Sequence, residues 1–268
     1  MKRIVEVCAG SYQDCIAAYK GKADRVELNS ALSVGGLTPS VSSLRKVKEE
    51  TNLKVICMVR PRAAGFCYDE DDEMIIMEDA KLLLDNEADG ISFGFLNEDG
   101  TIKEDKTAQM IELVHSYHKE AVFHRAFDVC PDAYEAIETL IRTNEELGLY
   151  DEFSLSFNPK TKKDYLLKII QFKKFLEGKD LLKDLQEKYG DKIELLPGSG
   201  VNATNAIELM EYTGINQVHS SCKSYLSDPT TANNGVSYAY LTDEHEMDYD
   251  IVNEDLVTKL VEVVKQGA

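Results

Sequence analysis

The sequence predicts a single α/β domain over residues 1–268, folded as a TIM (β/α)8 barrel. Three observations favour this fold. Short β-branched runs alternate with longer amphipathic runs, eight of the short runs read as strands, and no glycine-rich turn of a doubly wound sheet follows the first strand. A chain of 268 residues that is 43% hydrophobic can bury the core of such a barrel.

The expected elements alternate along the chain. The expected strands are residues 3–8, 25–28, 54–60, 90–94, 121–125, 152–156, 192–196 and 215–220. Apolar residues recur at helical spacing in 133–141 and again in 256–264. Thr38, Pro131 and Asn202 are expected to mark the first turns of three helices.

Two segments interrupt this alternation. Residues 157–191, between the sixth and seventh expected strands, are lysine-rich and long enough for two helices. Residues 222–250 form a long acidic connection before the last helix. A connection of this length predicts a lid, an arm or an oligomer contact, or alternatively a mobile surface loop.

The composition excludes several classes of partner. Thirty lysines and arginines against 48 aspartates and glutamates give a net charge of −18, which disfavours nucleic acid. No run approaches the roughly 20 apolar residues of a membrane helix, and MKRIVEVCAG is too short and broken for a signal-peptide core. The six cysteines form no CxxC pair, and most are expected to be reduced thiols. We therefore expect a cytoplasmic protein without a membrane partner.

Polar residues follow nearly every expected strand. The loops that follow the strands of a barrel converge at one rim, so these side chains are expected to share a site there. The candidates for proton transfer are Glu6, Glu27, His124 and Asp128. His124 can act as an acid or base near neutral pH, and Asp128 either orients that imidazole or caps the helix near Pro131. Glu6 and Glu27 serve the site or form buried ion pairs with Arg60 or Arg125.

Anion binding is expected from arginines and from a glycine turn at the same rim. The expected residues are Arg60, Arg62, Arg125, Gly198, Ser199, Gly200, Ser220 and Ser221. Arg60 and Arg62 flank a proline and can clamp a carboxylate or phosphate, or pair with the glutamates. The Gly198–Gly200 turn follows the seventh strand, where barrels hold phosphate, although a tight turn also requires glycine.

A soft metal is a further possibility, because Cys8 ends the first strand and thiolates bind Cu(I). The alternative is that Cys8 fills space in the core.

Several stretches resemble the CutC family, named for copper homeostasis. They are "EVCAGSYQDCIAAYKGKADRVELNSALSVGGLTPS" (6–40), "MVRPRAAGFCY" (58–68), "ADGISFGFLNEDGTI" (88–102), "FHRAFD" (123–128), "PGSGVNATN" (197–205) and "VHSS" (218–221). The resemblance implies a cytosolic TIM barrel, commonly a homo-oligomer, that binds or manages copper, with His124 or His219 as auxiliary ligands. Family members usually carry cysteine where this chain has Asn29, so Cys8 is the remaining rim cysteine associated with copper.

Two functions are therefore expected. The first is a CutC-like copper-binding barrel. The alternative is an isomerase or lyase acting on a small phosphorylated or carboxylated molecule at the rim.

Overall fold

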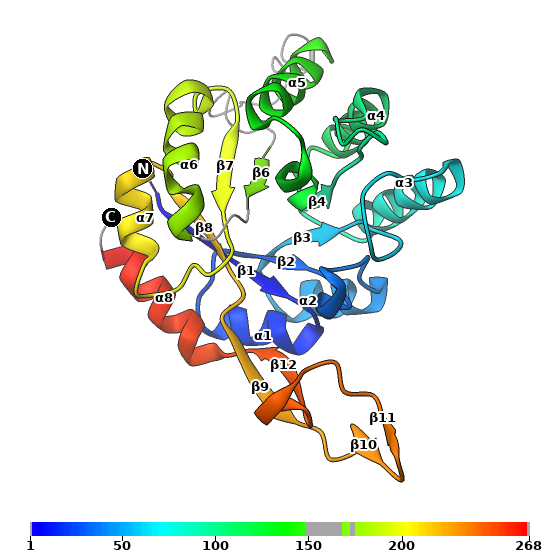
Figure 1. Ribbon diagram of the computed structural model, residues 1–268, viewed down its shortest axis with the longest axis vertical. Helices are drawn as coiled ribbons and strands as arrows, with labels where there is room; N and C mark the ends of the chain where they lie inside the picture. Colours follow the sequence, from blue (N-terminus) through cyan, green and yellow to red (C-terminus); the bar gives the residue numbers. More distant parts are fainter. Residues whose placement is uncertain (1, 148–167, 172–174, 267–268) are drawn as a thin grey trace.

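The chain forms a barrel of parallel strands surrounded by helices (Figure 1). The computed structural model describes residues 2–147, 168–171 and 175–266. The barrel strands are β1 (Ile4–Ala9), β2 (Arg25–Leu28), β3 (Lys54–Met58), β4 (Gly90–Phe93), β5 (Glu120–Phe123), β6 (Lys168–Gln171), β7 (Glu194–Pro197) and β8 (Gln217–Ser220). The helices are α1 (Tyr12–Lys20), α2 (Val41–Glu50), α3 (Glu70–Asp85), α4 (Glu104–Ser116), α5 (Ala133–Glu146), α6 (Phe175–Tyr189), α7 (Ala206–Thr213) and α8 (Glu254–Gln266).

The sheet has the strand order of a (β/α)8 barrel, which confirms the predicted fold class. Backbone ladders join the strands in the order β7-β6-β5-β4-β3-β2-β1-β8, and every pairing is parallel. The two outer strands of this order, β7 and β8, lie next to each other. There the side-chain Nε2 of Gln217 donates to the carbonyl of Leu195 at 3.0 Å, so a side chain contributes to closing the cylinder.

The sixth strand differs from the prediction. The structure places Lys168–Gln171 between β5 and β7, whereas the predicted strand at 152–156 lies outside the described residues. The extra length therefore precedes β6 and does not follow it, and α6 connects β6 to β7. The run EFSLS alternates like a strand, but it is KIIQ that occupies the sixth position.

Alternation along the strands separates two environments. On β1, Val5, Val7 and Ala9 are fully buried in the large core between strands and helices, while Glu6 and Cys8 project to the opposite face, inside the barrel. A small apolar cluster of Ile56, Val122 and Leu196 fills part of that interior. Other interior positions of β1, β2 and β8 carry polar and charged groups, among them Glu6, Glu27 and His219, and a site can form there.

Three helices begin later than predicted, and in two of them, α2 and α5, the capping residue explains the start. Ser40, rather than Thr38, caps α2, because its hydroxyl accepts from the backbone N–H of Ser43 at 3.1 Å. Asp132 caps α5 by accepting from two backbone N–H groups of its first turn. The α7 helix begins at Ala206, so Asn202 lies in the preceding loop and not in its first turn.

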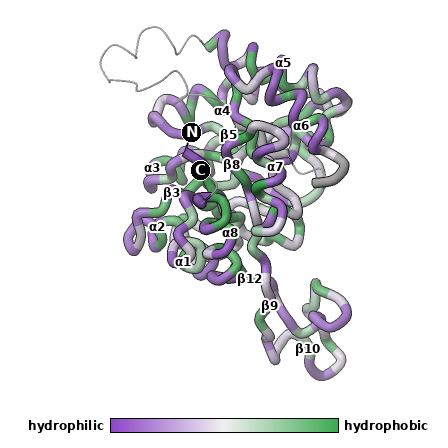
Figure 2. Tube along the Cα trace, turned by 90° about the vertical axis from the view of Figure 1, so that its left-hand side faces the viewer, coloured by the Kyte–Doolittle hydropathy of each residue, from purple (hydrophilic) through white to green (hydrophobic). Residues whose placement is uncertain are grey.

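The connection before α8 is an arm. It comprises β9 (Lys223–Ser227) and β12 (Asp248–Val252), paired antiparallel, with a small outer hairpin of β10 (Ala232–Asn233) and β11 (Val236–Ser237). Both views show it projecting away from the barrel (Figures 1 and 2). Apolar side chains are exposed along it, most of all Tyr238 at 82%. Within the described part of the chain, none of the helices combines the length and apolar character needed to cross a bilayer.

Candidate functional site

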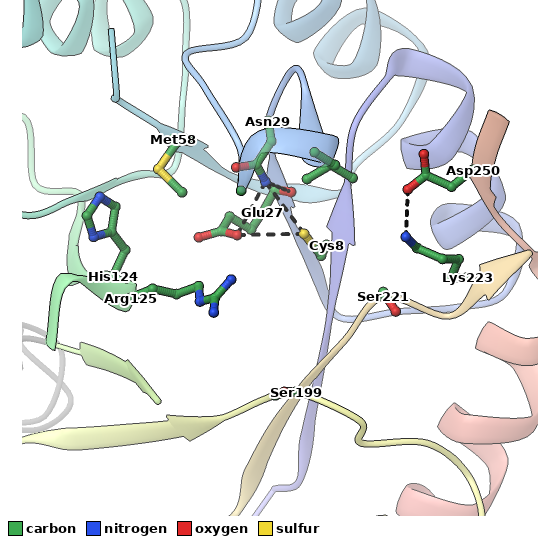
Figure 3. A pocket seen from close by; sticks show the side chains of 12 residues that line it. Cys8, Glu27, Asn29, Met58, His124, Arg125, Ser199, Ser221, Lys223 and Asp250 are labelled. Atoms are coloured by element: carbon green, nitrogen blue, oxygen red, sulfur yellow. Dashed lines mark hydrogen bonds and ion pairs between the residues drawn. The ribbon is translucent and has the colours of Figure 1, made fainter. Parts of the chain in front are cut away.

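A pocket of about 380 Å³ lies at the C-terminal mouth of the barrel. Its walls come from segments far apart in the sequence (Figure 3). Cys8 and Glu27 line one side, whereas Arg125, Ser199 and Lys223 line others. The predicted convergence of strand ends is thus observed for these residues.

Three potential metal ligands meet beside this pocket. The ligand atoms of Cys8, Glu27 and His219 all lie within 4.8 Å of one another. Adjacent strands produce this grouping, because Cys8 is in register with Glu27 on β2 and the neighbouring β8 carries His219. All six cysteines of the chain are free thiols, as predicted, and Cys8 is half-buried.

Neighbouring side chains hold Glu27 in place. The hydroxyl of Ser92 on β4 donates to Glu27 Oε1 at 2.7 Å, and Asn29 Nδ2 donates to Oε2 at 3.3 Å. Asn29 Nδ2 also lies 3.7 Å from Cys8 Sγ (Figure 3). The Oδ1 atom of Asn29 is buried without a hydrogen-bond partner among the described residues. Asn29 therefore bridges the thiol and the carboxylate.

Glu6 lies deeper and orients His219. The carboxylate of Glu6 accepts from His219 Nδ1 at 2.7 Å and forms an ion pair with Arg25 Nε. All three side chains are at most 2% exposed. Burial alone raises the pKa of Glu6, but the charges of Arg25 and His219 outweigh burial and lower this pKa to about 2. Glu6 is thus held as a charged carboxylate that positions His219, and its buried ion pair forms with Arg25 and not with Arg60 or Arg125.

His219 is held in one orientation by that contact. Burial alone lowers the pKa of His219, but the adjacent Cys8 and Glu6 outweigh it and raise the pKa well above the usual value. Because Nδ1 faces Glu6, Nε2 is the nitrogen that a metal ion would take. Burial raises the pKa of the Cys8 thiol, and a bound cation would lower this pKa again by stabilising the thiolate.

His124 is buried and neutral. Its Nδ1 accepts from the backbone N–H of Ala126 at 3.2 Å, which caps a short 3₁₀ helix (Arg125–Val129). Burial, with a contribution from the charge of Arg60, lowers the pKa of His124 to about 3. Its Nε2 is buried and has no hydrogen-bond partner among the described residues. His124 lines the pocket as predicted, but its low pKa removes it as a proton carrier near neutral pH.

The predicted arginine clamp is not present. The guanidinium of Arg60 donates to the carbonyls of Val34 and Gly36 at 3.0 and 2.9 Å, so it organises the loop after β2. Arg62 pairs with Asp72 at 2.6 Å. Neither arginine pairs with Glu6 or Glu27 or lines the pocket. The sequence could not reveal this, because the competing acceptors are backbone carbonyls brought close by folding.

Arg125 does line the pocket, with Asp128 beside it. Arg125 Nε lies 3.7 Å from Asp128 Oδ2. Asp128 therefore accompanies a guanidinium, and it is Asp132 that caps the following helix, so the capping prediction for Asp128 is wrong. Asp128 does not orient His124, whose Nδ1 is engaged by the backbone.

The glycine turn contributes less than predicted. Ser199 and Ser221 line the pocket, whereas Gly198 and Gly200 do not. Ser220 is buried and its hydroxyl donates to the carbonyl of Val201 at 2.6 Å, a structural contact. Gly200 has a φ of +84°, so the turn does require glycine for its backbone conformation.

Sequence reasoning missed several residues of the site. Ser92 was visible as a polar strand residue but had no motif around it. Lys223 and Asp250, which pair at 2.9 Å in the pocket wall, are separated by the whole arm and share no local pattern. Inward alternation on β2 is the signal that could have linked Arg25 to Glu6.

Comparison with known proteins places the chain in one family. The CutC family model matches residues 3–150 and 164–224. A CutC family protein of Treponema denticola is 39% identical over 97% of this chain and 99% of its own length. The human copper homeostasis protein cutC homolog is 33% identical over 82% of this chain and 74% of its own. The crystal structure of CutC from Streptococcus agalactiae has a TM-score of 0.69 at 27% identity, covering 82% of this chain and 98% of that one. The chain therefore belongs to the CutC family.

Proposed function

We propose that this protein binds a copper ion at the mouth of its barrel, with Cys8, Glu27 and His219 as ligands. The observation that carries the proposal is the convergence of their three ligand atoms within 4.8 Å. The family to which the chain belongs is named for copper homeostasis in its human relative. The copper is the cargo of such a protein, and the chain supplies the coordinating groups.

The donor set fits copper. A thiolate and an imidazole are both established copper ligands, and thiolate in particular favours Cu(I). The support behind the ligands also fits, because Glu6 fixes the ring of His219 while Ser92 and Asn29 fix Glu27. Such supporting contacts orient ligands before the ion arrives.

The resemblance to the family implies a cysteine at the position of Asn29, and the amide found here changes the character of the site. One thiolate is accompanied by a nitrogen and an oxygen donor instead of a second sulfur. The site is therefore proposed to bind Cu(I) less tightly than a two-cysteine site would, because Cu(I) favours sulfur.

A cytoplasmic location is part of the proposal. All six cysteines are free, including Cys67 at the surface, and reduced thiols suit a compartment with a reducing thiol pool.

The proposal is tested by anaerobic titration of the reduced protein with Cu(I) in competition with a colorimetric Cu(I) chelator. A Cys67→Ser background removes the exposed thiol that would bind copper adventitiously. We expect one ion retained per chain, and Cys8→Ser to weaken retention by at least about tenfold, since it removes the sulfur ligand. Glu27→Gln, which keeps the shape of the side chain, should weaken it less.

Cys130→Ser is the matched control, because Cys130 is half-buried like Cys8 but its thiol bonds the carbonyl of Ala126. This control should retain copper as the parent does. Absence of stoichiometric retention, or equal retention after loss of Cys8, would refute the copper site.

A further inference from the structure

We infer that Cys8, Glu27 and His219 also bind Zn²⁺, as a three-ligand centre whose fourth coordination position opens into the mouth pocket and accepts an oxygen atom of a small molecule. This zinc centre rests on the proposed function, because it uses the same three side chains. It adds a second metal, the side chain that selects that metal, and the class of molecule that the metal holds.

The donor set of the cluster suits zinc. Zn²⁺ binds cysteine sulfur, histidine nitrogen and carboxylate oxygen, and the cluster offers one of each. Cu(I) favours sulfur, so the carboxylate of Glu27 is the donor that contributes least to copper binding. Cys8 and His219 serve either ion. Glu27 is therefore the side chain that adds selectivity for zinc.

Glu27 is a buried carboxylate without a lysine or arginine partner among the residues that the structure describes. Its side chain is 4% exposed. The other two buried glutamates, Glu6 and Glu73, each form an ion pair with an arginine or with lysines. Glu27 instead accepts hydrogen bonds from neutral groups, namely the hydroxyl of Ser92 and the amide of Asn29. Because buried charges are normally paired or coordinate metals, this carboxylate points to a cation at the cluster.

The geometry of the cluster is close to that of a zinc site. Cys8 Sγ lies 3.9 Å from Glu27 Oε2. Zinc bonds of about 2.3 Å to sulfur and about 2.0 Å to oxygen place these two atoms roughly 3.5 Å apart across a tetrahedral ion. Ser92 donates to the other oxygen of Glu27, so Oε2 is the oxygen beside the thiol. Small movements of these side chains therefore suffice to bring both donors onto one ion.

The fourth coordination position is open. Within the described part of the chain, no further histidine, cysteine, aspartate or glutamate joins the three ligands. Zinc sites with three protein ligands keep their fourth position for a water molecule or a substrate. Cys8 and Glu27 both line the pocket of about 380 Å³, so the side without a ligand faces that pocket (Figure 3). A small molecule in the pocket can therefore reach the metal.

The charges of the pocket favour an uncharged molecule. A Zn²⁺ ion, one thiolate and one carboxylate cancel one another. The two cations of the wall have carboxylate partners, since Lys223 pairs with Asp250 and Arg125 lies beside Asp128. Leu32 also lines the pocket and offers an apolar surface. The molecule is therefore assigned as small and uncharged, with a carbonyl oxygen as the donor to the metal.

The test is anaerobic titration of the reduced, metal-free Cys67→Ser protein with Zn²⁺ in competition with a chromophoric zinc chelator. Co²⁺, a spectroscopic substitute for Zn²⁺, is titrated in parallel. We expect one ion per chain, with a sulfur-to-cobalt charge-transfer band and the strong visible d–d bands of four-coordinate cobalt. Acetohydroxamic acid, an uncharged molecule with a carbonyl oxygen, should shift the d–d bands until the shift saturates.

Glu27→Gln separates the two metals. It should weaken Zn²⁺ binding by at least about a hundredfold, because losing even a contact behind a ligand costs roughly 10–100-fold, whereas Cu(I) retention should fall by less than about tenfold. Cys8→Ser should weaken Zn²⁺ binding and abolish the charge-transfer band, and it suffices alone if Glu27→Gln fails to fold.

Glu73→Gln is the matched control for Glu27→Gln. Glu73 is 3% exposed, against 4% for Glu27, but it lies on α3 and not in the cluster. This control should bind Zn²⁺ like the parent. Far-UV circular dichroism verifies the folding of every variant.

Absence of stoichiometric Zn²⁺ binding, or equal binding by Glu27→Gln and Glu73→Gln, would overturn the zinc centre. Cobalt d–d bands that acetohydroxamic acid leaves unchanged would overturn the open position. The two metals also give separate outcomes. Retention of Cu(I) without Zn²⁺ binding would refute the zinc centre alone, and Zn²⁺ binding without Cu(I) retention would refute the copper proposal alone.

Discussion

Replacing Glu6 by glutamine is expected to destabilise the fold strongly at neutral pH. The carboxylate is 1% exposed and pairs with both Arg25 and His219. Its pKa of about 2, against an ordinary value of 4.5, corresponds to roughly 3 kcal/mol of favourable interaction. Breaking a buried ion pair typically costs about 3–5 kcal/mol, so two independent estimates agree.

The same pKa predicts the pH dependence of this effect. A carboxyl group whose pKa is lowered by folding stabilises the protein above its unfolded pKa and loses that contribution as the pH falls toward the folded value. The difference in unfolding free energy between parent and Glu6→Gln should therefore be fully present between pH 4.5 and 6.5, where the Glu6 carboxylate and the His219 imidazolium are both charged, and shrink as the pH falls toward 2.

Urea unfolding followed by circular dichroism measures this difference at each pH. Glu112→Gln, at an exposed position of α4, is the control and should change the unfolding free energy by less than about 0.5 kcal/mol. A cost below about 1 kcal/mol for Glu6→Gln, or a difference that does not shrink on acidification, would refute the account of Glu6 as a charged positioning residue.

Three further predictions concern the same region. Asn29→Cys places a second thiol within reach of Cys8 and should raise the affinity for Cu(I) by at least about tenfold in the chelator competition. An unchanged affinity would count against a copper site there. In the parent, the unfolding free energy should fall by up to roughly 5 kcal/mol as the pH drops from 6.5 toward 3, because the buried imidazole of His124 resists protonation in the folded state. His124→Asn, which keeps an acceptor for the backbone N–H of Ala126, should lack this fall. Urea midpoints that fall equally in both proteins would contradict this. Phe93→Ala should cost about 3–5 kcal/mol in urea unfolding, since Phe93 is fully buried, and a much smaller cost would show that the core there can collapse.

The sequence predicted the fold well because hydrophobic alternation is a local property. Seven expected strands overlap strands of the barrel, and the apolar faces of α5 and α8 are buried as their spacing indicated. The prediction of the sixth barrel strand at 152–156 was wrong, because the strand that occupies this position, KIIQ (Lys168–Gln171), is a short apolar run. Length and periodicity do not distinguish such a run from part of a helix. The predicted homo-oligomer stays a prediction.

The site was predicted only in part, because contacts across the barrel have no local signature. Cys8, Glu27, His124 and Arg125 were correctly placed at the mouth by their positions at strand ends. A charged side chain at a strand end can point into the pocket or bind backbone carbonyls of a nearby loop, and the path of that loop decides between the two. Arg60 binds the carbonyls of Val34 and Gly36 for this reason.

The two ends of the arm meet at the barrel, where the backbone N–H of Asn253 donates to the carbonyl of Cys222 at 2.9 Å. The barrel itself consequently has only a short gap to span between β8 and α8, however long the intervening chain becomes. The match to the family model ends at residue 224, just after β9 begins, so most of the arm lies outside the matched residues. Its outer hairpin can therefore lengthen, shorten or be exchanged in the course of evolution, and likewise in protein engineering, while the path of the surrounding scaffold is preserved.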